Sequence, residues 1–346
     1  MIRGLPKGVS DAYALAHQLN GKGALLPRFA MGVGAIFMIQ RVRPADSSLA
    51  ASTLAEETDP VLLGQLLSLV AVQKLKTVPI GEVHQCLQDG NHHKRFACFT
   101  FDGAYRGVLD SVYPLFRERG LPFTVYVGTD FLDTGKVPWW MALEVLVKEN
   151  DRLIMDQEGL TDMIICQTLE EKQTTYAILL DHFANIDSEE RINAIYSECT
   201  AHNVDIAALA KREMLSATEL KTLATDELVT IGSLAGGMHP LSTMTFDGAR
   251  ESILQSLNKL EAEIGYRPRH LAFPGGNSAT VCERDVRVAG IFDLDSAVTP
   301  VEGALWPEHA TERFALPRIA LDNDPATLVR ALLLSGDNQA RQHAAR

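Results

Sequence analysis

The 346-residue sequence lacks any excess of positive charge, and its few cysteines follow no recognisable pattern. Its 32 Lys and Arg residues are outnumbered by 44 Asp and Glu residues, which gives a net charge of −12. Nucleic-acid-binding domains usually present a basic face, so we expect no nucleic-acid partner. The five cysteines are an odd number without a Cys-Xaa-Xaa-Cys pair, which argues against a disulfide framework and a zinc knuckle.

Long apolar runs are also missing. The longest early run, residues 31–39, contains two glycines and is too short to cross a bilayer. No small-residue cleavage site follows it, and no dinucleotide-binding, phosphate-loop or Ser-His-Asp pattern occurs elsewhere. We therefore expect a protein without a membrane span, in the cytoplasm, with reduced thiols that are buried or half-buried.

An alternation of strand and helix patterns is present instead. Residues 95–102 read as a buried strand that ends at Asp102, residues 105–119 as a helix stopped by Gly120, and residues 122–128 as a second strand. A strand, a helix and a strand joined by short connections predict a parallel sheet. Asp102 is then expected at the carboxyl end of its strand, where such sheets carry their chemistry.

The same alternation flanks this unit. Further predicted strands span residues 33–42, 228–233, 270–274, 292–299 and 316–321, and predicted helices span residues 59–75, 246–264 and 325–334. We predict one main domain over residues 31–335, preceded by a peripheral N-terminal helix at 1–30 and followed by a polar tail at 336–346.

Residues of about 140–225 differ in character. The stretch 151–220 holds 14 Asp and Glu against 5 Lys and Arg, which is −9 of the net charge of −12. Thr168 with Glu171, and Ser216 with Glu219, have the spacing of helix capping boxes. We predict a mostly helical insertion whose charge forms a solvated face.

Several segments, in order along the chain, resemble the signature of polysaccharide deacetylases, the NodB homology domain. Phe99–Arg106 (FTFDGAYR) is similar to that family's Thr-Phe-Asp-Asp-Gly-Tyr-Arg. Other similar segments are Tyr113–Phe116, Gly120–Val127, Thr230–Ser233 followed by His239–Ser242, and Ala272–Gly276. Gly34–Val42 resembles the first strand of the permuted subgroup. The resemblance covers residues 32–335 and implies an α/β fold, a distorted (β/α) barrel of about seven strands.

The resemblance also implies metal-assisted hydrolysis of an acetamide, with an Asp and two His on the ion, an Asp as general base and a His as general acid. Asp102 matches the base and His239 one metal ligand. The other matching positions carry residues that cannot do the same chemistry: Gly103 for the metal Asp, Leu234 for the first metal His, Gln40 for the acid and Gly275 for the tyrosine of the Pro-Tyr-Gly turn. Since a catalytic zinc generally needs three protein ligands, we expect no metal cofactor.

Each retained residue has two interpretations. Asp102 is either a residual base or a structural acid that caps the following helix. His239 is either a vestigial ligand or a hydrogen-bonded loop residue. The resemblance makes Trp139, Trp140, Tyr105 and Arg318 candidates for saccharide contact. The tryptophans could instead anchor the insertion, and Arg318 could instead form a structural ion pair.

Two main functions therefore remain open. The first is a catalytically impaired deacetylase-like protein of carbohydrate metabolism that keeps a cleft for an N-acetylated saccharide. The second is an active de-N-acetylase that hydrolyses the C–N amide bond with a rebuilt zinc or similar metal site, in which an acid such as Asp130 or Asp247 supplies the missing ligand. A metal-free hydrolase based on Asp102 lacks an obvious acid and electrophile.

Overall fold

The computed structural model describes residues 32–44, 57–89, 94–157, 160–186, 188–235, 241–274 and 281–321. The expectations for residues 1–30, 325–334 and 336–346, and for His239 and Gly275, lie outside these ranges. Within the described ranges, no helix has the length and apolar character needed to cross a membrane. The strands are β1 (Gly34–Ile39), β2 (Arg41–Val42), β3 (Glu57–Thr58), β4 (Lys76–Thr77), β5 (Phe96–Asp102), β6 (Phe123–Val127), β7 (Arg152–Gln157), β8 (Leu160–Ile165), β9 (Val229–Leu234), β10 (His270–Ala272), β11 (Ser296–Glu302) and β12 (Leu316–Ala320).

Seven parallel strands close into a barrel in the order β1-β12-β11-β10-β9-β6-β5, and β5 pairs with β1 to complete the ring. The short strand β4 adds to the amino end of β5. The predicted (β/α) barrel is therefore confirmed. Closure brings β5 and β12 to either side of β1, although more than two hundred residues separate them in the sequence.

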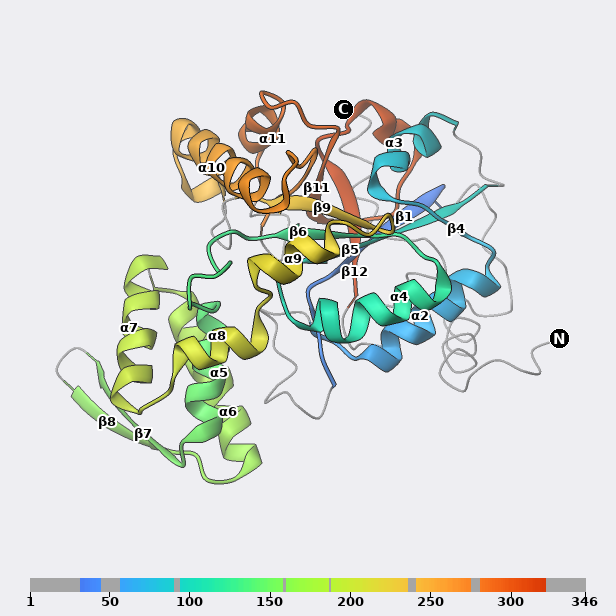
Figure 1. Ribbon diagram of the computed structural model, residues 1–346. Coiled ribbons are helices and arrows are strands. Elements are labelled where there is room, and N and C mark those ends of the chain that lie inside the picture. The colour runs from blue at the N-terminus through green and yellow to red at the C-terminus, as the bar shows by residue number, and fades with distance from the viewer. Residues whose placement is uncertain are drawn as a thin grey trace, which may run out of the picture.

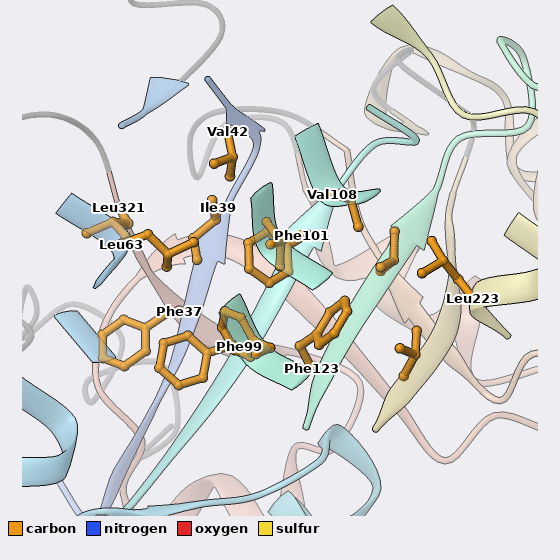
Figure 2. Packing of buried hydrophobic residues seen from close by; sticks show 14 of the residues in the cluster. Phe37, Ile39, Val42, Leu63, Phe99, Phe101, Val108, Phe123, Leu223 and Leu321 are labelled. Carbon is orange, nitrogen blue, oxygen red and sulfur yellow. The ribbon is translucent and has the colours of Figure 1, made fainter. Parts of the chain in front are cut away.

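Alternate residues of the barrel strands pack in two different cores, one between the barrel and its helices and one inside the barrel. In β5, Phe99 and Phe101 face outward and pack with Leu63 of α2 and Phe116 of α4, and the Phe99 and Phe116 rings meet edge to face at 5.2 Å. Figure 2 shows this outer layer. Cys98 instead joins a cluster to which all seven barrel strands contribute, which marks it as the barrel interior.

Gly232 of β9 makes room inside the barrel. A Cβ atom at this position would lie 2.5 Å from the ring of Tyr126 on the neighbouring strand β6. Only glycine therefore lets the Tyr126 ring lie across the barrel interior against β9.

The helices of the barrel and of the insertion begin and end at recognisable signals. Both predicted capping boxes are present, at Thr168 with Glu171 and at Ser216 with Glu219. Gly265 ends α10 in the left-handed conformation, directly after the predicted helix over 246–264. The helices are α2 (Pro60–Val72), α3 (Ile80–Asp89), α4 (Tyr113–Arg119), α5 (Trp139–Glu149), α6 (Leu169–Ala184), α7 (Ser188–Ala201), α8 (Ile206–Glu213), α9 (Ala217–Leu223), α10 (Phe246–Ile264) and α11 (Glu283–Ala289).

The predicted helix over 105–119 was wrong at its start. Tyr105 forms an isolated bridge to Met214, a wide π-helical turn covers Val108–Val112, and the α-helix begins at Tyr113. Pro114 explains the wide turn, because its ring has no N–H to continue the α-helical hydrogen bonds into the preceding turn.

The insertion forms a lobe beside the barrel (Figure 1). Helices α5, α6 and α7 pack together around their own apolar cluster. The stretch is not helical throughout, because β7 and β8 form an antiparallel hairpin that the sequence did not predict. Helix α9 leads from this lobe back to the barrel strand β9 (Figure 1).

Candidate functional site

Asp102 lies at the carboxyl end of β5 and forms a bidentate ion pair across the barrel interior. Arg318 of β12 donates from Nη1 to Oδ1 and from Nη2 to Oδ2, both at 2.7 Å. Asp102 keeps 8% of its surface exposed, whereas Arg318 keeps 1%. Such a forked contact fixes the plane of the carboxylate, so Asp102 is held in one orientation.

Arg318 is fixed by further contacts in the barrel. Its Nε donates to the Thr299 carbonyl at 3.0 Å, and Nη1 also donates to Thr100 Oγ1 at 3.2 Å. Its guanidinium carbon lies 6.0 Å from the centroid of the Tyr126 ring. Arg318 thus forms an ion pair, which was one of the two interpretations of this residue. Because its side chain is buried, Arg318 affects the barrel mouth by holding the Asp102 carboxylate. The structural role that the sequence allowed for Asp102 was a helix cap. In the structure, Asp102 forms an ion pair at the end of β5.

The backbone at Gly103 leaves no room for an acidic side chain. Gly103 has φ +95°, a conformation that favours glycine, and a Cβ atom there would lie 2.6 Å from Cε2 of Tyr105. Tyr105 is 2% exposed, and burial raises the pKa of its hydroxyl. The Tyr105 ring therefore fills the space into which a carboxylate from position 103 would project.

Leu234 and Gln40, the other matched positions that the structure describes, add no metal ligand. Leu234 ends β9 and is buried in the interior cluster with Tyr126, Ala272 and Val298. Gln40 follows β1 and is half-buried. Across the described ranges, no group of three His, Cys, Asp or Glu side chains could hold a metal ion. The residues at these positions therefore do not fit the metal centre that the resemblance implies.

A buried charge cluster that sequence reasoning missed joins the barrel mouth to the insertion. Arg41 of β2 contacts Glu57 at 3.2 Å, Glu144 of α5 at 3.1 Å and Glu213 of α8 at 2.7 Å. Arg43 also contacts Glu144, at 2.7 Å. Burial alone would raise the pKa of Glu144, but attraction to Arg43 and Arg41 outweighs it and lowers that pKa. These charges lock the insertion onto the barrel.

Trp139 and Trp140 begin α5 and are each 8% exposed. Their rings meet edge to face with centroids 5.8 Å apart, and both belong to the core of the insertion, where Tyr105 also packs. The guanidinium of Arg191 on α7 lies 4.8 Å from the centroid of Trp139. Both tryptophans also line a pocket of about 230 Å³, so they combine an anchoring position with a place in a cavity wall.

The five cysteines are all free. Cys98, Cys166 and Cys199 are buried and Cys86 is half-buried, but Cys282 is exposed, which corrects the expectation that every thiol would be covered. Cys282 is the residue directly before α11, and this position at the amino end of the helix leaves its side chain at the surface.

The fold resembles solved deacetylase structures. The Streptococcus pyogenes deacetylase PplD, solved in complex with acetate, aligns with a TM-score of 0.55 at 13% identity over 86% of this chain and 97% of its own. IcaB from Ammonifex degensii aligns with a TM-score of 0.52 at 12% identity over 88% of this chain and 97% of its own. No protein-family model and no curated protein sequence matches the chain. At these identities the likeness establishes the barrel fold.

Proposed function

We propose that this protein is a polysaccharide-deacetylase-like protein of carbohydrate metabolism that has lost metal-dependent hydrolysis and has kept a saccharide cleft. The observation that carries the proposal is the apolar filling of the two ligand positions. Tyr105 occupies the space beside Gly103, and Leu234 packs among carbon side chains in the barrel interior. Hydrolysis of an acetamide needs the carbonyl to be polarised as well as a base, and these positions supply no such group.

In this proposal Asp102 is a vestigial base and His239 a vestigial ligand. The Arg318 ion pair holds Asp102 near the barrel mouth, where it accepts hydrogen bonds and can orient a sugar hydroxyl. Tyr105, Trp139 and Trp140 lie together at the junction of the barrel and the insertion, which favours the same region for saccharide contact. The partner is an N-acetylated saccharide, and the proposed location is the cytoplasm, which the five free thiols favour.

A second candidate is an active de-N-acetylase with a rebuilt metal site. The ion pair of Asp102 favours it, because a fixed carboxylate at the carboxyl end of a barrel strand is suited to act as a base. Asp130 and Asp247, the residues that could supply an additional ligand, are both exposed.

One experiment separates the two candidates. Metal-free protein is titrated with zinc by calorimetry, and the zinc-loaded protein is then incubated with N-acetylglucosamine oligomers while released amine is measured. Asp102→Asn serves as the matched control, because it keeps the shape of the side chain and removes the base. We expect no saturable zinc binding below about 10 μM and the same background amine release from both proteins. Tight binding at one site, with amine release that disappears in Asp102→Asn, would establish the second candidate.

A further inference from the structure

Phe131 lies between two pockets on the insertion side of the barrel. It belongs to the loop of residues 128–138 that connects the carboxyl end of β6 to α5. The ring is half-buried, packs against the core of the insertion, and lines both the pocket of about 230 Å³ and a second one of about 330 Å³. Because the two pockets share the Phe131 wall, they lie next to each other, and together, as what we call the groove, they offer room for consecutive units of a chain-like ligand.

The first pocket has rigid aromatic walls. Trp139 and Trp140 form its buried back, and Tyr196 of α7 completes it. The Tyr196 hydroxyl donates to the Val137 carbonyl at 2.7 Å and accepts from the Val137 N–H at 3.1 Å, which ties α7 to the loop. Binding to such a preformed site loses little side-chain entropy.

The second pocket is more polar and is also held in place. Its wall includes the ion pair between Arg106 and Glu219 at 2.9 Å, and Glu219 accepts from the Ser216 N–H at 2.9 Å. Ala207 and Met214 supply apolar surface beside these groups. An apolar surface with a few fixed polar groups is typical of small-molecule sites, and such groups can form hydrogen bonds with hydroxyl groups of a ligand.

The charge of the groove sets it apart from the rest of the protein. Four basic and three acidic side chains line the two pockets, a net of +1, whereas the whole chain carries −12. Lys136 and Asp130 are the exposed charges at the first pocket. This lining is close to charge balance, so the groove itself offers no net attraction to a polycation, and its polar groups can bind a neutral ligand.

We propose that this groove binds two consecutive residues of an uncharged, N-acetylated oligosaccharide, with the face of Phe131 packed against a sugar ring. The choice of an N-acetylated chain rests on the proposed function. The groove itself rests on the two pockets and on their charge. It extends the saccharide contact proposed at Trp139 and Trp140 along the loop to Phe131 and does not use the interior of the barrel. Phe131 supplies the apolar face, and the polar side chains on either side supply hydrogen bonds to hydroxyl and amide groups.

Binding of the N-acetylglucosamine tetramer and of the glucosamine tetramer to the full-length protein is measured by calorimetry. We expect saturable binding of the acetylated tetramer and at least tenfold weaker binding of the cationic one. Phe131→Ala should weaken binding of the acetylated tetramer at least tenfold. Tyr266→Ala is the matched control, because Tyr266 is an exposed aromatic residue in the loop before β10, which enters the opposite edge of the barrel. It should bind like the wild type.

Lys136→Glu gives a second, independent test at an exposed position that should not disturb folding. It changes the charge at the first pocket by two units, so the preference for the acetylated over the cationic tetramer should fall at least threefold. Wild-type affinity in a folded Phe131→Ala protein would refute binding in the groove, and the saccharide would then bind elsewhere on the protein. Absence of tetramer binding by the wild type would overturn the saccharide part of the proposed function together with the groove.

Discussion

The ion pair between Asp102 and Arg318 makes the sharpest quantitative prediction. Arg318→Met removes the cation and leaves a carboxylate with 8% of its residue surface exposed and no counter-charge. Asp102→Leu leaves the guanidinium, which is 1% exposed, with the Thr100 hydroxyl and the Thr299 carbonyl as its hydrogen-bond partners among the described residues. Breaking a buried pair from one side costs about 3–5 kcal/mol. Each single variant should lose that much of a total stability of about 5–15 kcal/mol.

The double variant Arg318→Met with Asp102→Leu should be more stable than either single variant. Replacing both charges with apolar side chains removes the burial cost of the ions together with their attraction, which is often close to neutral. The free energies of unfolding are measured by guanidinium denaturation, followed by far-UV circular dichroism and by fluorescence. The three tryptophans report on both parts of the protein, because Trp139 and Trp140 lie in the insertion and Trp306 lies near the barrel.

Additive losses would refute this reasoning. If the double variant loses the sum of the two single losses, the two side chains are not coupled, and Thr100 and Thr299 rather than Asp102 hold Arg318. Tetramer binding by the double variant gives a functional readout in the same experiment. Because the groove does not use the interior of the barrel, binding should be unchanged. Lost binding in a folded double variant would place Asp102 in the saccharide cleft.

Three further predictions follow from the interior of the barrel. Gly103→Asp should lower the free energy of unfolding by about 1–3 kcal/mol without creating zinc binding, because the new side chain meets the Tyr105 ring. Gly103→Ala measures the cost of the backbone conformation separately. Tight zinc binding by Gly103→Asp would contradict the argument that Tyr105 fills the site. Gly232→Ala should cost about 1–3 kcal/mol through its contact with Tyr126 and should be rescued in part by Tyr126→Leu, as seen in urea midpoints. Burial lowers the pKa of His270 to about 4. The unfolded chain takes up this proton below about pH 6.5 and the folded one does not, so about 3 kcal/mol of stability is lost as the pH falls from 6.5 to 4. His270→Asn should flatten that loss in urea denaturation measured between pH 7.5 and 5, and an equally steep loss in the variant would assign it to other groups.

The sequence by itself determined the barrel strands, several helices and helix caps, because these depend on residues that are close together in the chain. Alternation of strand and helix patterns predicted a parallel sheet, and the resemblance to the deacetylase signature implied that it closes into a barrel. The spacing of Thr168 with Glu171 predicted a capping box that the structure contains. Asp102 was expected at a strand end because the apolar run before it stops there, and it ends β5. These signals extend over a few residues, so they are visible without knowledge of the fold.

Only the tertiary structure decided which side chains meet. Asp102 and Arg318 are 216 residues apart, and Arg41 meets Glu213 across 172 residues, so no local pattern could pair them. The Tyr105 ring beside Gly103 depends on a positive φ angle, and the groove around Phe131 depends on how α7 and α8 pack against a loop. The closure of the barrel and the docking of the insertion set these contacts, because they bring distant segments to one place.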